Sequence, residues 1–328
     1  MAREHVALVT GAEGFIGSRL AACLEAKGWR VVSAVRLPIP SVFRRFSHPV
    51  ACDLRDRDRV VSVVLQSKPT HVFHLAAESH PTSSWIDPVA TFESNVVGSF
   101  NLFEALRRLK RPPVIVSACS GAEYGCVSSS RLPIDERHGL RPVNPYGFTK
   151  LCLDAMSRFY NTCYGLRTVA LRLFNTTGPG KTMDAPSDFI WQLVRIRRGL
   201  QPPILEVGNL TSRRSFLHVD DAVNGFYLAS LKGRAGEVYN LCADRPILIR
   251  TLARLAIRLS GVRASLCTVA RLLRPLDEKT VFGNSAKFRK LTGWQPSISL
   301  ESTLLAMFDH AERCHDSGDF KLNSIQPF

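Results

Sequence analysis

The stretch HVALVTGAEGFIGSRL, residues 5–20, decides the fold. Its first part, residues 5–10, is a short apolar run typical of a strand buried on both faces of a parallel sheet. Gly11, Gly14 and Gly17 then form a G-x-x-G-x-x-G pattern directly before a segment with helical spacing. Glycines there permit a tight strand-to-helix turn and let backbone N–H groups approach a pyrophosphate at the helix N-terminus. The stretch predicts a dinucleotide site, and the alternative is a glycine-rich turn without a ligand.

Apolar periodicity alternates between strands and helices downstream of this stretch. We expect strands at 30–35, 71–77, 113–120 and 167–176, and helices at 16–28, 90–109 and 146–165. This βαβα order predicts a parallel sheet covered by helices on both faces. The fold class is therefore α/β, a Rossmann-like doubly wound parallel sheet.

The regular alternation loosens after about residue 178, where a loop rich in glycine and proline begins. Beyond it we expect helices at 189–199, 219–231 and 248–261, and short strands near 204–209, 214–219 and 237–242. We divide the chain into a dinucleotide-binding Rossmann domain, residues 1–178, and a smaller α/β substrate lobe, mainly residues 179–328. Some later segments are expected to return to the main sheet, and a cleft is expected between the two parts.

Composition indicates a soluble globular protein, since 45% of the residues are apolar and 22% are charged. The sequence contains no run of eighteen or more uncharged apolar residues, so we expect no transmembrane helix. The N-terminal stretch lacks the pattern of a signal peptide. Nine cysteines are scattered singly without Cys-x-x-Cys, which favours a reducing compartment and a cytoplasmic protein. Cys119 and Cys126 lack ligand partners at metal-binding spacing, so no metal is expected.

The formal net charge of +15 is consistent with two kinds of partner. Nucleic-acid binders are basic, but here the basic residues occur in small groups, without a long basic arm or interleaved aromatics. Recruitment of anionic small molecules explains the charge at least as well. We therefore expect an anionic substrate and no nucleic-acid partner.

The end of the second expected strand distinguishes NAD from NADP, because an acid there binds the ribose 2′-hydroxyl and a basic residue suits a 2′-phosphate. Val35 occupies the acid's place, Arg36 follows, and no Asp or Glu occurs within 30–50. We therefore favour NADP(H) over NAD(H), with Arg36 on the phosphate. The alternative is a solvated Arg36 and less specifically held NAD. Asp53 and Leu54 either reach the adenine from the next loop or form an exposed turn.

The segment NPYGFTK, residues 144–150, places Tyr146 and Lys150 four residues apart on one face of an expected helix. A free phenol has a pKa of about 10, and a nearby ammonium favours the phenolate. Ser120, at an expected strand end, can hydrogen-bond a substrate oxygen and stabilise an oxyanion. Each feature alone is also consistent with an ordinary turn. Beside a dinucleotide site they indicate hydride and proton transfer at a ketone.

The combination resembles the extended short-chain dehydrogenase/reductase family over nearly the whole chain. The matching motifs are the glycine pattern, HLAAES at 74–79, Asn95, Ser120 in SACSGAEYG, and Tyr146-x-x-x-Lys150. The resemblance implies catalytic roles for Ser120, Tyr146 and Lys150. It implies cofactor contacts from Gly11, Gly14, Phe15, Ile16, Gly17, Arg36, Asp53, Leu54, Leu75, Ala76, Ala77, Asn95, Tyr146 and Lys150. It also implies a homodimer formed through the long helices, and an Asn95 that helps to position the active-site helix rather than face solvent.

The region after Ser120 distinguishes reactions within this family. The 4,6-dehydratases carry an acid directly after the Ser/Thr or two places beyond it, as general acid and base for water elimination. Here Gly121 and Ala122 occupy those places, and Glu123 is displaced by one. If the stretch is extended, Glu123 points to the opposite side. The pattern therefore argues against a dehydratase.

The C-terminal half resembles the GDP-4-keto-6-deoxy-D-mannose reductases. The matching stretches are 171–180, 205–223, 236–252, 271–277 and 283–304. The resemblance places Arg214 and Arg274 on the diphosphate of a sugar nucleotide, which suits guanidinium groups, and adds Asp277 to the substrate site. Surface charges are the alternative for both arginines.

Some residues depart from the pattern of these reductases. Glu78 replaces the usual glutamine of HLAAQS, and Ser215 replaces the aspartate that commonly follows the diphosphate arginine. Asn175 and Thr176, just past a strand end, are expected to touch the substrate together with Glu78 and Ser120. These differences leave room for a related 4-keto-6-deoxy sugar.

The sequence thus predicts an NADP(H)-dependent reductase acting on C4 of a nucleotide-linked 4-keto-6-deoxy-hexose, with a GDP-linked sugar favoured. The closest alternative is a nucleotide-sugar C4 epimerase, which uses the same residues with a bound cofactor, and a 4,6-dehydratase fits less well. A different class is a non-catalytic cofactor-sensing or RNA-binding protein on this fold. Only the net charge favours that class, and the chain keeps the Tyr/Lys pair.

Overall fold

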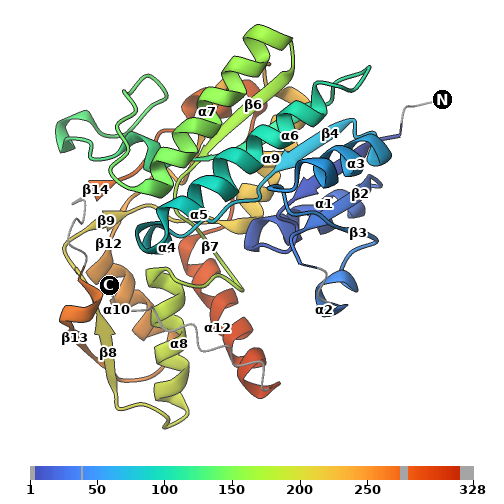
Figure 1. Ribbon diagram of the computed structural model, residues 1–328. Helices are drawn as coiled ribbons and strands as arrows, with labels where there is room; N and C mark the ends of the chain where they lie inside the picture. The colour runs from blue at the N-terminus through green and yellow to red at the C-terminus, as the bar shows by residue number, and fades with distance from the viewer. Residues whose placement is uncertain (1–3, 38–39, 274–279, 318–328) are drawn as a thin grey trace.

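The computed structural model describes residues 4–37, 40–273 and 280–317 (Figure 1). Its largest sheet has seven parallel strands in the order β11-β6-β5-β4-β1-β2-β3. The strands are β1 (Val6–Thr10), β2 (Arg30–Val35), β3 (His48–Ala51), β4 (His71–His74), β5 (Val114–Ser120), β6 (Arg167–Leu173) and β11 (Val238–Leu241). The strand order reverses between β1 and β4, so a crevice for a ligand is expected at the carboxyl ends of these two strands.

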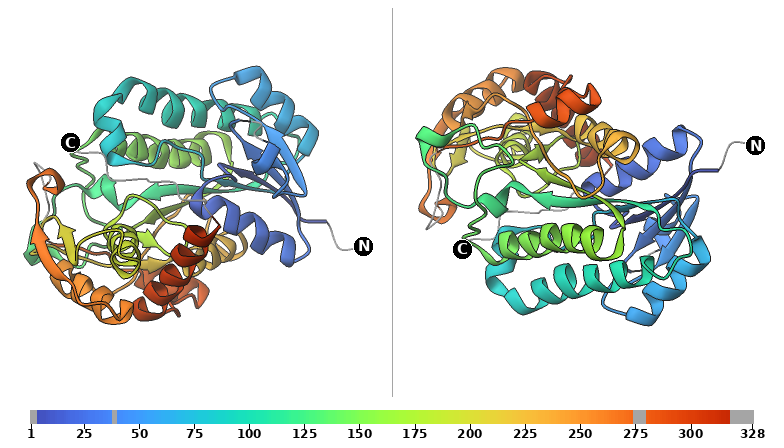
Figure 2. Two further views of the ribbon diagram at one scale, coloured as in Figure 1. Left: turned by 90° about the horizontal axis from the view of Figure 1, so that it is seen from below. Right: turned by 90° about the horizontal axis from the view of Figure 1, so that it is seen from above.

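Helices cover both faces of this sheet, as the two views of Figure 2 show. The long helices are α1 (Phe15–Ala26), α3 (Arg57–Ser67), α6 (Gly98–Leu106), α7 (Pro145–Tyr164) and α9 (Val219–Lys232). On one face Leu20 of α1 and Phe226 of α9 belong to one buried apolar cluster. On the other face Val64, Leu102 and Leu153 belong to a second one. The predicted doubly wound α/β fold is confirmed.

The predicted long helix at 90–109 is divided into three segments. They are α5 (Pro88–Phe92), a π-helical turn over Glu93–Val97, and α6. Such π-turns widen a helix locally and are frequent at functional sites. Here the turn contains Asn95, whose side chain is buried.

A separate set of helices and short strands lies to one side of the main sheet, in the lower part of Figure 1. It contains α8 (Ala185–Arg197), β8 (Ile204–Val207), α10 (Ile249–Ser260), β13 (Ser265–Thr268) and α12 (Leu300–Asp316). These elements have an apolar cluster of their own, built around Leu193, Leu252 and Leu304. In contrast α9 and β11 lie with the main sheet, as expected for later segments that return to it.

The remaining elements are short. They are α2 (Pro40–Phe43), α4 (Pro81–Ile86), β7 (Thr176–Thr177), β9 (Arg213–Arg214), β10 (Leu217–His218), β12 (Ile247–Leu248), β14 (Thr280–Val281) and α11 (Ala286–Thr292), with 3₁₀ turns at Gly121–Tyr124, Ser129–Arg131 and Ala270–Leu272. The sequence prediction omitted β3 and α3. Strand β3 is short and half-exposed, contains Pro49 and pairs only with β2, so its apolar pattern is weak.

Within the described ranges, no helix is both long and apolar enough to cross a membrane.

Candidate active site

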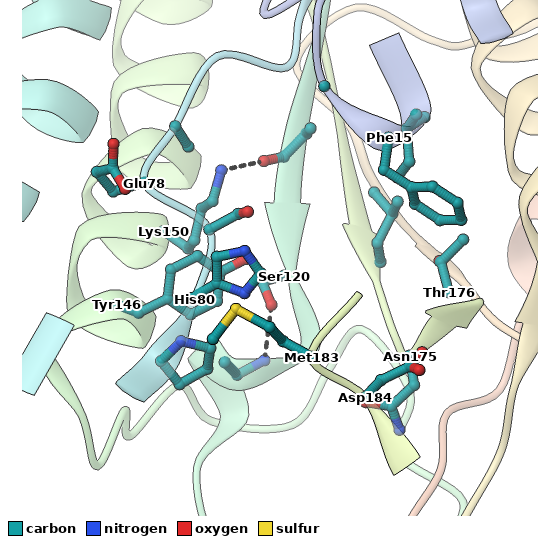
Figure 3. A pocket seen from close by; sticks show the side chains of 18 of the residues that line it. Phe15, Glu78, His80, Ser120, Tyr146, Lys150, Asn175, Thr176, Met183 and Asp184 are labelled. Atoms are coloured by element: carbon teal, nitrogen blue, oxygen red, sulfur yellow. Dashed lines mark hydrogen bonds between the residues drawn. The ribbon is translucent and has the colours of Figure 1, made fainter. Parts of the chain in front are cut away.

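A cleft of about 830 Å³ follows the carboxyl ends of the main sheet and reaches the first turn of α8. Its lining comes from both parts of the chain and includes Thr10, the last residue of β1. It also includes Ser120 at the end of β5 and Asp184, the N-cap of α8 (Figure 3). This volume lies within the usual range for small-molecule and cofactor sites. The cleft is where the strand order reverses, as expected for a doubly wound sheet.

The glycine loop joins β1 to α1 at one end of this cleft. Gly11 has a φ of +68°, and a Cβ there would lie 2.8 Å from the backbone of Ala76. A Cβ on Gly17 would lie 2.1 Å from the carbonyl oxygen of Gly11. Gly14 is the N-cap of α1 and offers no side-chain cap, so the first helical N–H groups are left to a ligand. The residues present therefore fit the pyrophosphate of a dinucleotide.

Arg36 lies at the edge of the cleft, directly after β2. Its guanidinium Nη1 is 2.9 Å from Oε1 of Glu78, and its backbone N–H donates to Oε1 of Glu13 at 2.9 Å. Both partners of the ion pair are half-exposed, and such pairs contribute little to stability. A bound anion can therefore replace Glu78 on Arg36 at small cost.

The other residues predicted to bind the cofactor also line the cleft, with one exception. Phe15, Ile16, Asp53, Leu54, Leu75, Ala76 and Ala77 are among its lining residues. Asp53 is paired with the Arg55 guanidinium, which holds the pKa of that carboxyl below its usual value.

The exception is Asn95, which is buried behind the cleft. Its Oδ1 accepts from the N–H of Glu78 at 2.7 Å, and its Nδ2 donates to the carbonyl oxygen of Glu78 at 3.0 Å. The same amide donates to Oγ1 of Thr149 on α7 at 3.0 Å. Asn95 thus connects the loop after β4 to the helix that carries Tyr146 and Lys150.

Ser120, Tyr146 and Lys150 meet in the cleft (Figure 3). Helix α7 begins at Pro145 after the N-cap Asn144, whose side chain accepts from the N–H of Gly147. This start places Tyr146 in the first turn and Lys150 one turn later. The Lys150 ammonium donates to the Ala118 carbonyl on β5 at 2.8 Å and lies 5.8 Å from the centroid of the Tyr146 ring.

Burial controls the protonation of this group. It raises the pKa of Tyr146 to about 12, although a hydrogen bond with Ser120 acts in the opposite direction. Burial also lowers the pKa of Lys150. Tyr146 is therefore protonated at neutral pH and is suited to donate a proton.

The stretch after Ser120 is a 3₁₀ turn and not an extended segment, so the stated reason for excluding Glu123 was wrong. Glu123 nevertheless faces away from the cleft. Its carboxylate is fully buried and accepts from the N–H of Ser120 at 2.7 Å, while its other oxygen lies 3.2 Å from Arg172. Ser120 in turn accepts from the N–H of Ala122 at 3.1 Å, which fixes the serine side chain.

A buried charge cluster supports this turn from below. Cys119, Glu123 and Asp154 bring potential metal ligands within 4.8 Å of one another. The guanidinium of Arg172 already lies among them, donating to Oδ2 of Asp154 at 2.8 Å and to the hydroxyl of Tyr124 at 2.8 Å. Arginine therefore supplies the positive charge that these carboxylates require.

The residues predicted to contact substrate also line the cleft where they are described. These are Glu78, Ser120, Asn175, Thr176 and Arg214. Asn175 donates weakly to the carbonyl of Ser215 at 3.4 Å, and Ser215 itself is buried. Arg274 and Asp277 lie outside the described residues.

The residues that line the same cleft and that sequence reasoning missed include His80, Lys181, Met183 and Asp184. His80 and Met183 line the same cleft as Ser120 and Tyr146, and Figure 3 draws all four together. Burial lowers the pKa of His80, which favours the neutral imidazole. Met183 has a φ of +61°, an uncommon conformation for a residue other than glycine. These residues lie in loops, where the sequence has no periodic pattern that would predict a site. His80 directly follows the HLAAES motif, and this neighbourhood is the one sequence feature that could have indicated it.

Comparison with known proteins defines the class of this site. The family model described as GDP-mannose 4,6 dehydratase matches residues 8–307. GDP-6-deoxy-D-mannose reductase of Pseudomonas aeruginosa is 30% identical over 93% of this chain and 96% of its own length. The structure of RMD from Pseudomonas aeruginosa complexed with NADPH has a TM-score of 0.84 at 29% identity, covering 94% of this chain and 99% of its own. UDP-glucose 4-epimerase of Brucella ovis in complex with NAD has a TM-score of 0.82 at 30% identity, covering 94% and 98%.

The fold, the glycine loop and the Ser/Tyr/Lys group thus belong to a nicotinamide-dependent oxidoreductase of nucleotide sugars. The chain is a member of the GDP-mannose 4,6 dehydratase family, within the extended short-chain dehydrogenases/reductases.

Proposed function

We propose that the protein reduces the C4 ketone of a nucleotide-linked 4-keto-6-deoxy-hexose, with GDP-4-keto-6-deoxy-mannose as the favoured substrate. The observation that carries the proposal is the convergence of Tyr146, Ser120 and Lys150 beside the end of β5, in the cleft that begins at the glycine loop. A reduction requires a proton donor at this position in every turnover. An acid at the place used by dehydratases is lacking, since Ala122 stands there and Glu123 faces inward.

The nicotinamide, when bound, supplies the hydride that reduces the carbonyl carbon. The Ser120 hydroxyl hydrogen-bonds the C4 oxygen and stabilises the negative charge that develops on it. Tyr146 gives its phenolic proton to that oxygen. Lys150, held by the Ala118 carbonyl, stabilises the phenolate left on Tyr146 until it is reprotonated.

For the cofactor we propose NADP(H), with Arg36 as the group that binds the 2′-phosphate. Binding would exchange the half-exposed Glu78 carboxylate for a phosphate dianion, which is a stronger partner for a guanidinium. The relatives include both an NADPH complex and an NAD complex. The preference for NADP(H) over NAD(H) therefore depends on residues of this chain. Glu13 and Glu78 lie beside Arg36, and their negative charges reduce the preference for a 2′-phosphate.

On the sugar side we propose that the lobe mainly built from 179–328 binds the nucleotide sugar. Arg214 lines the cleft there, and its guanidinium is suited to a diphosphate. Arg274 and Asp277 are proposed to complete this site. The net charge of +15 favours the arrival of such an anionic substrate.

We also propose that the protein is a homodimer formed through α5, α6 and α7. Phe92, Phe100, Phe148 and Phe159 on these helices are each between 39% and 49% exposed. Phe92 and Phe148 stack with ring centroids 6.3 Å apart, so they form part of one apolar surface. Burying such a surface in a dimer is favourable. Sedimentation of the wild type and of Phe100→Glu tests this, and a monomeric wild type would contradict it.

A C4 epimerase is the second candidate, since one relative is a UDP-glucose 4-epimerase. An epimerase uses the same serine, tyrosine and lysine, so the arrangement of these three residues does not separate the two functions. Incubation with GDP-4-keto-6-deoxy-mannose and NADPH, followed at 340 nm, separates the two. The reductase consumes one NADPH per sugar, whereas an epimerase changes the sugar without net loss of NADPH. An RNA-binding protein would bind RNA at physiological salt and turn over no sugar.

A further inference from the structure

The tight turn GPGK, residues 178–181, is held against α1 although it comes more than 150 residues later in the sequence. The N–H of Lys181 donates to the carbonyl of Gly178 at 3.0 Å, which closes the turn. Gly180 has a φ of +82°, a conformation that favours glycine. The carbonyl of Pro179 accepts from Nη2 of Arg19 on α1 at 2.7 Å. The turn is thus fixed to the helix whose N-terminus faces the cleft.

This anchoring places Lys181 beside the start of α1. Its Nζ lies 5.3 Å from the ring centroid of Phe15, the first residue of that helix. Lys181 also lines the cleft, and its charge acts on His80 and Asp184 across it. The ammonium therefore lies beside the side chain of the residue that opens α1, on the wall of the cleft that also holds the glycine loop.

Lys181 differs from many other basic groups of the protein in having no salt-bridge or hydrogen-bond partner for its ammonium among the residues that the structure describes. Arg19, Arg36 and Arg55, for example, each pair with a carboxylate. A cation near a helix N-terminus is unfavourable by itself, because that end of the helix carries a partial positive charge. A bound anion would satisfy both groups.

We propose that Lys181 binds the pyrophosphate of the dinucleotide, opposite the N-terminus of α1. The inference rests on the proposed function, since it assumes that the glycine loop holds a dinucleotide. The main domain supplies backbone N–H groups on one side of the pyrophosphate, and the GPGK turn supplies the ammonium on the other. The turn precedes α8, so occupancy of the cofactor site also fixes the entrance to the substrate lobe.

The test is a fluorescence titration of the full chain with NADPH and with NADH. Lys181→Met is expected to weaken both dinucleotides to the same extent, by about tenfold, because both contain the pyrophosphate. Arg36→Met is expected to weaken NADPH only. Lys181→Arg should retain binding within about threefold, because the charge is kept. Lys110→Met, which removes an exposed lysine that does not line the cleft, should change neither affinity.

Other outcomes would overturn the proposal. Unchanged dinucleotide affinities in Lys181→Met, with weaker binding of GDP, would assign the residue to the substrate. Loss of NADPH affinity alone would assign it to the 2′-phosphate. If melting temperature falls and Lys181→Arg fails to restore binding, the side chain has a structural role. A wild type that binds neither dinucleotide would instead refute the proposed function itself.

Discussion

The two sides of the cleft are built in different ways. On the cofactor side, Gly11 directly follows the buried strand β1, and Ser120 is the last residue of β5. Lys150 lies in the long helix α7, which packs on the same sheet. On the proposed substrate side, Arg214 lies in β9, a strand of two residues, and Asn175 lies in the short connection between β6 and β7. Regular elements hold the Ser/Tyr/Lys group, whereas short connections hold the residues that we propose to bind the sugar nucleotide. From this difference we propose that reaction and specificity depend on different parts of this chain.

The largest expected effect tests the catalytic side. Tyr146→Phe removes the proton donor, and kcat should fall by roughly 10³-fold or more. Binding of NADPH should be retained, because the phenyl ring is preserved. Tyr164→Phe, at the exposed end of the same helix, is the matched control and should leave kcat unchanged. Intact turnover in Tyr146→Phe would show that the group does not transfer the proton.

Replacing Ser120 tests the same side at a smaller scale. Ser120→Ala removes a hydrogen-bond donor to the developing oxyanion, and kcat should fall by roughly 10²-fold. Ser120→Thr keeps a hydroxyl and should recover part of that activity. Steady-state kinetics with saturating cofactor measures both variants. Equal activities of the alanine and threonine variants would show that the Ser120 hydroxyl does not stabilise the oxyanion.

The preference for NADPH over NADH tests the edge of the cofactor side, where Arg36 pairs with Glu78. Arg36→Met should weaken the binding of NADPH by roughly tenfold and leave the affinity for NADH unchanged. Glu78→Gln should act in the opposite direction and strengthen the binding of NADPH. The substitution removes the carboxylate that lies 2.9 Å from the Arg36 guanidinium and competes with the phosphate. Dissociation constants measured for both dinucleotides with both variants decide this. A change of equal size for NADPH and NADH in Arg36→Met would rule out a 2′-phosphate contact.

The smallest expected effect concerns Glu123, the buried residue whose carboxyl group accepts from the N–H of Ser120. Burial, followed by the charge of Asp154, raises the pKa of Glu123 to about 8 from an ordinary 4.5. The folded protein therefore binds this proton more tightly than the unfolded chain does. The resulting stability is full below about pH 4.5 and is lost as pH rises to about 8.

Glu123→Gln removes that titration while keeping an oxygen that can accept from the N–H of Ser120. The melting temperature of the wild type should decline relative to that of the variant between pH 5 and pH 8. Parallel curves for the two proteins over this range would contradict the raised pKa.

The cofactor side could be predicted from the sequence because its signals are local. The glycine pattern follows a buried strand within a few residues, and Tyr146 and Lys150 lie on one helical turn. The raised pKa of Tyr146 could not be predicted, since it depends on desolvation of the phenol in the folded state. The orientation of Glu123 also depends on Arg172 of β6, a partner distant in sequence.

The substrate side was harder to predict for a related reason. Lys181 and Asp184 line the cleft in and just after the GPGK turn, which accepts a hydrogen bond from Arg19 of α1. Such a contact joins segments about 160 residues apart and has no periodic pattern in the sequence. The short strands β9 and β10 likewise follow from tertiary pairing more than from propensity.

The most direct test of the central claim is the transfer of deuterium from NADPH labelled at the nicotinamide C4 to GDP-4-keto-6-deoxy-mannose. If the protein is a reductase, the product sugar carries one deuterium at C4, and one NADP⁺ forms for each sugar reduced. A changed sugar without deuterium and without net oxidation of NADPH would contradict the account.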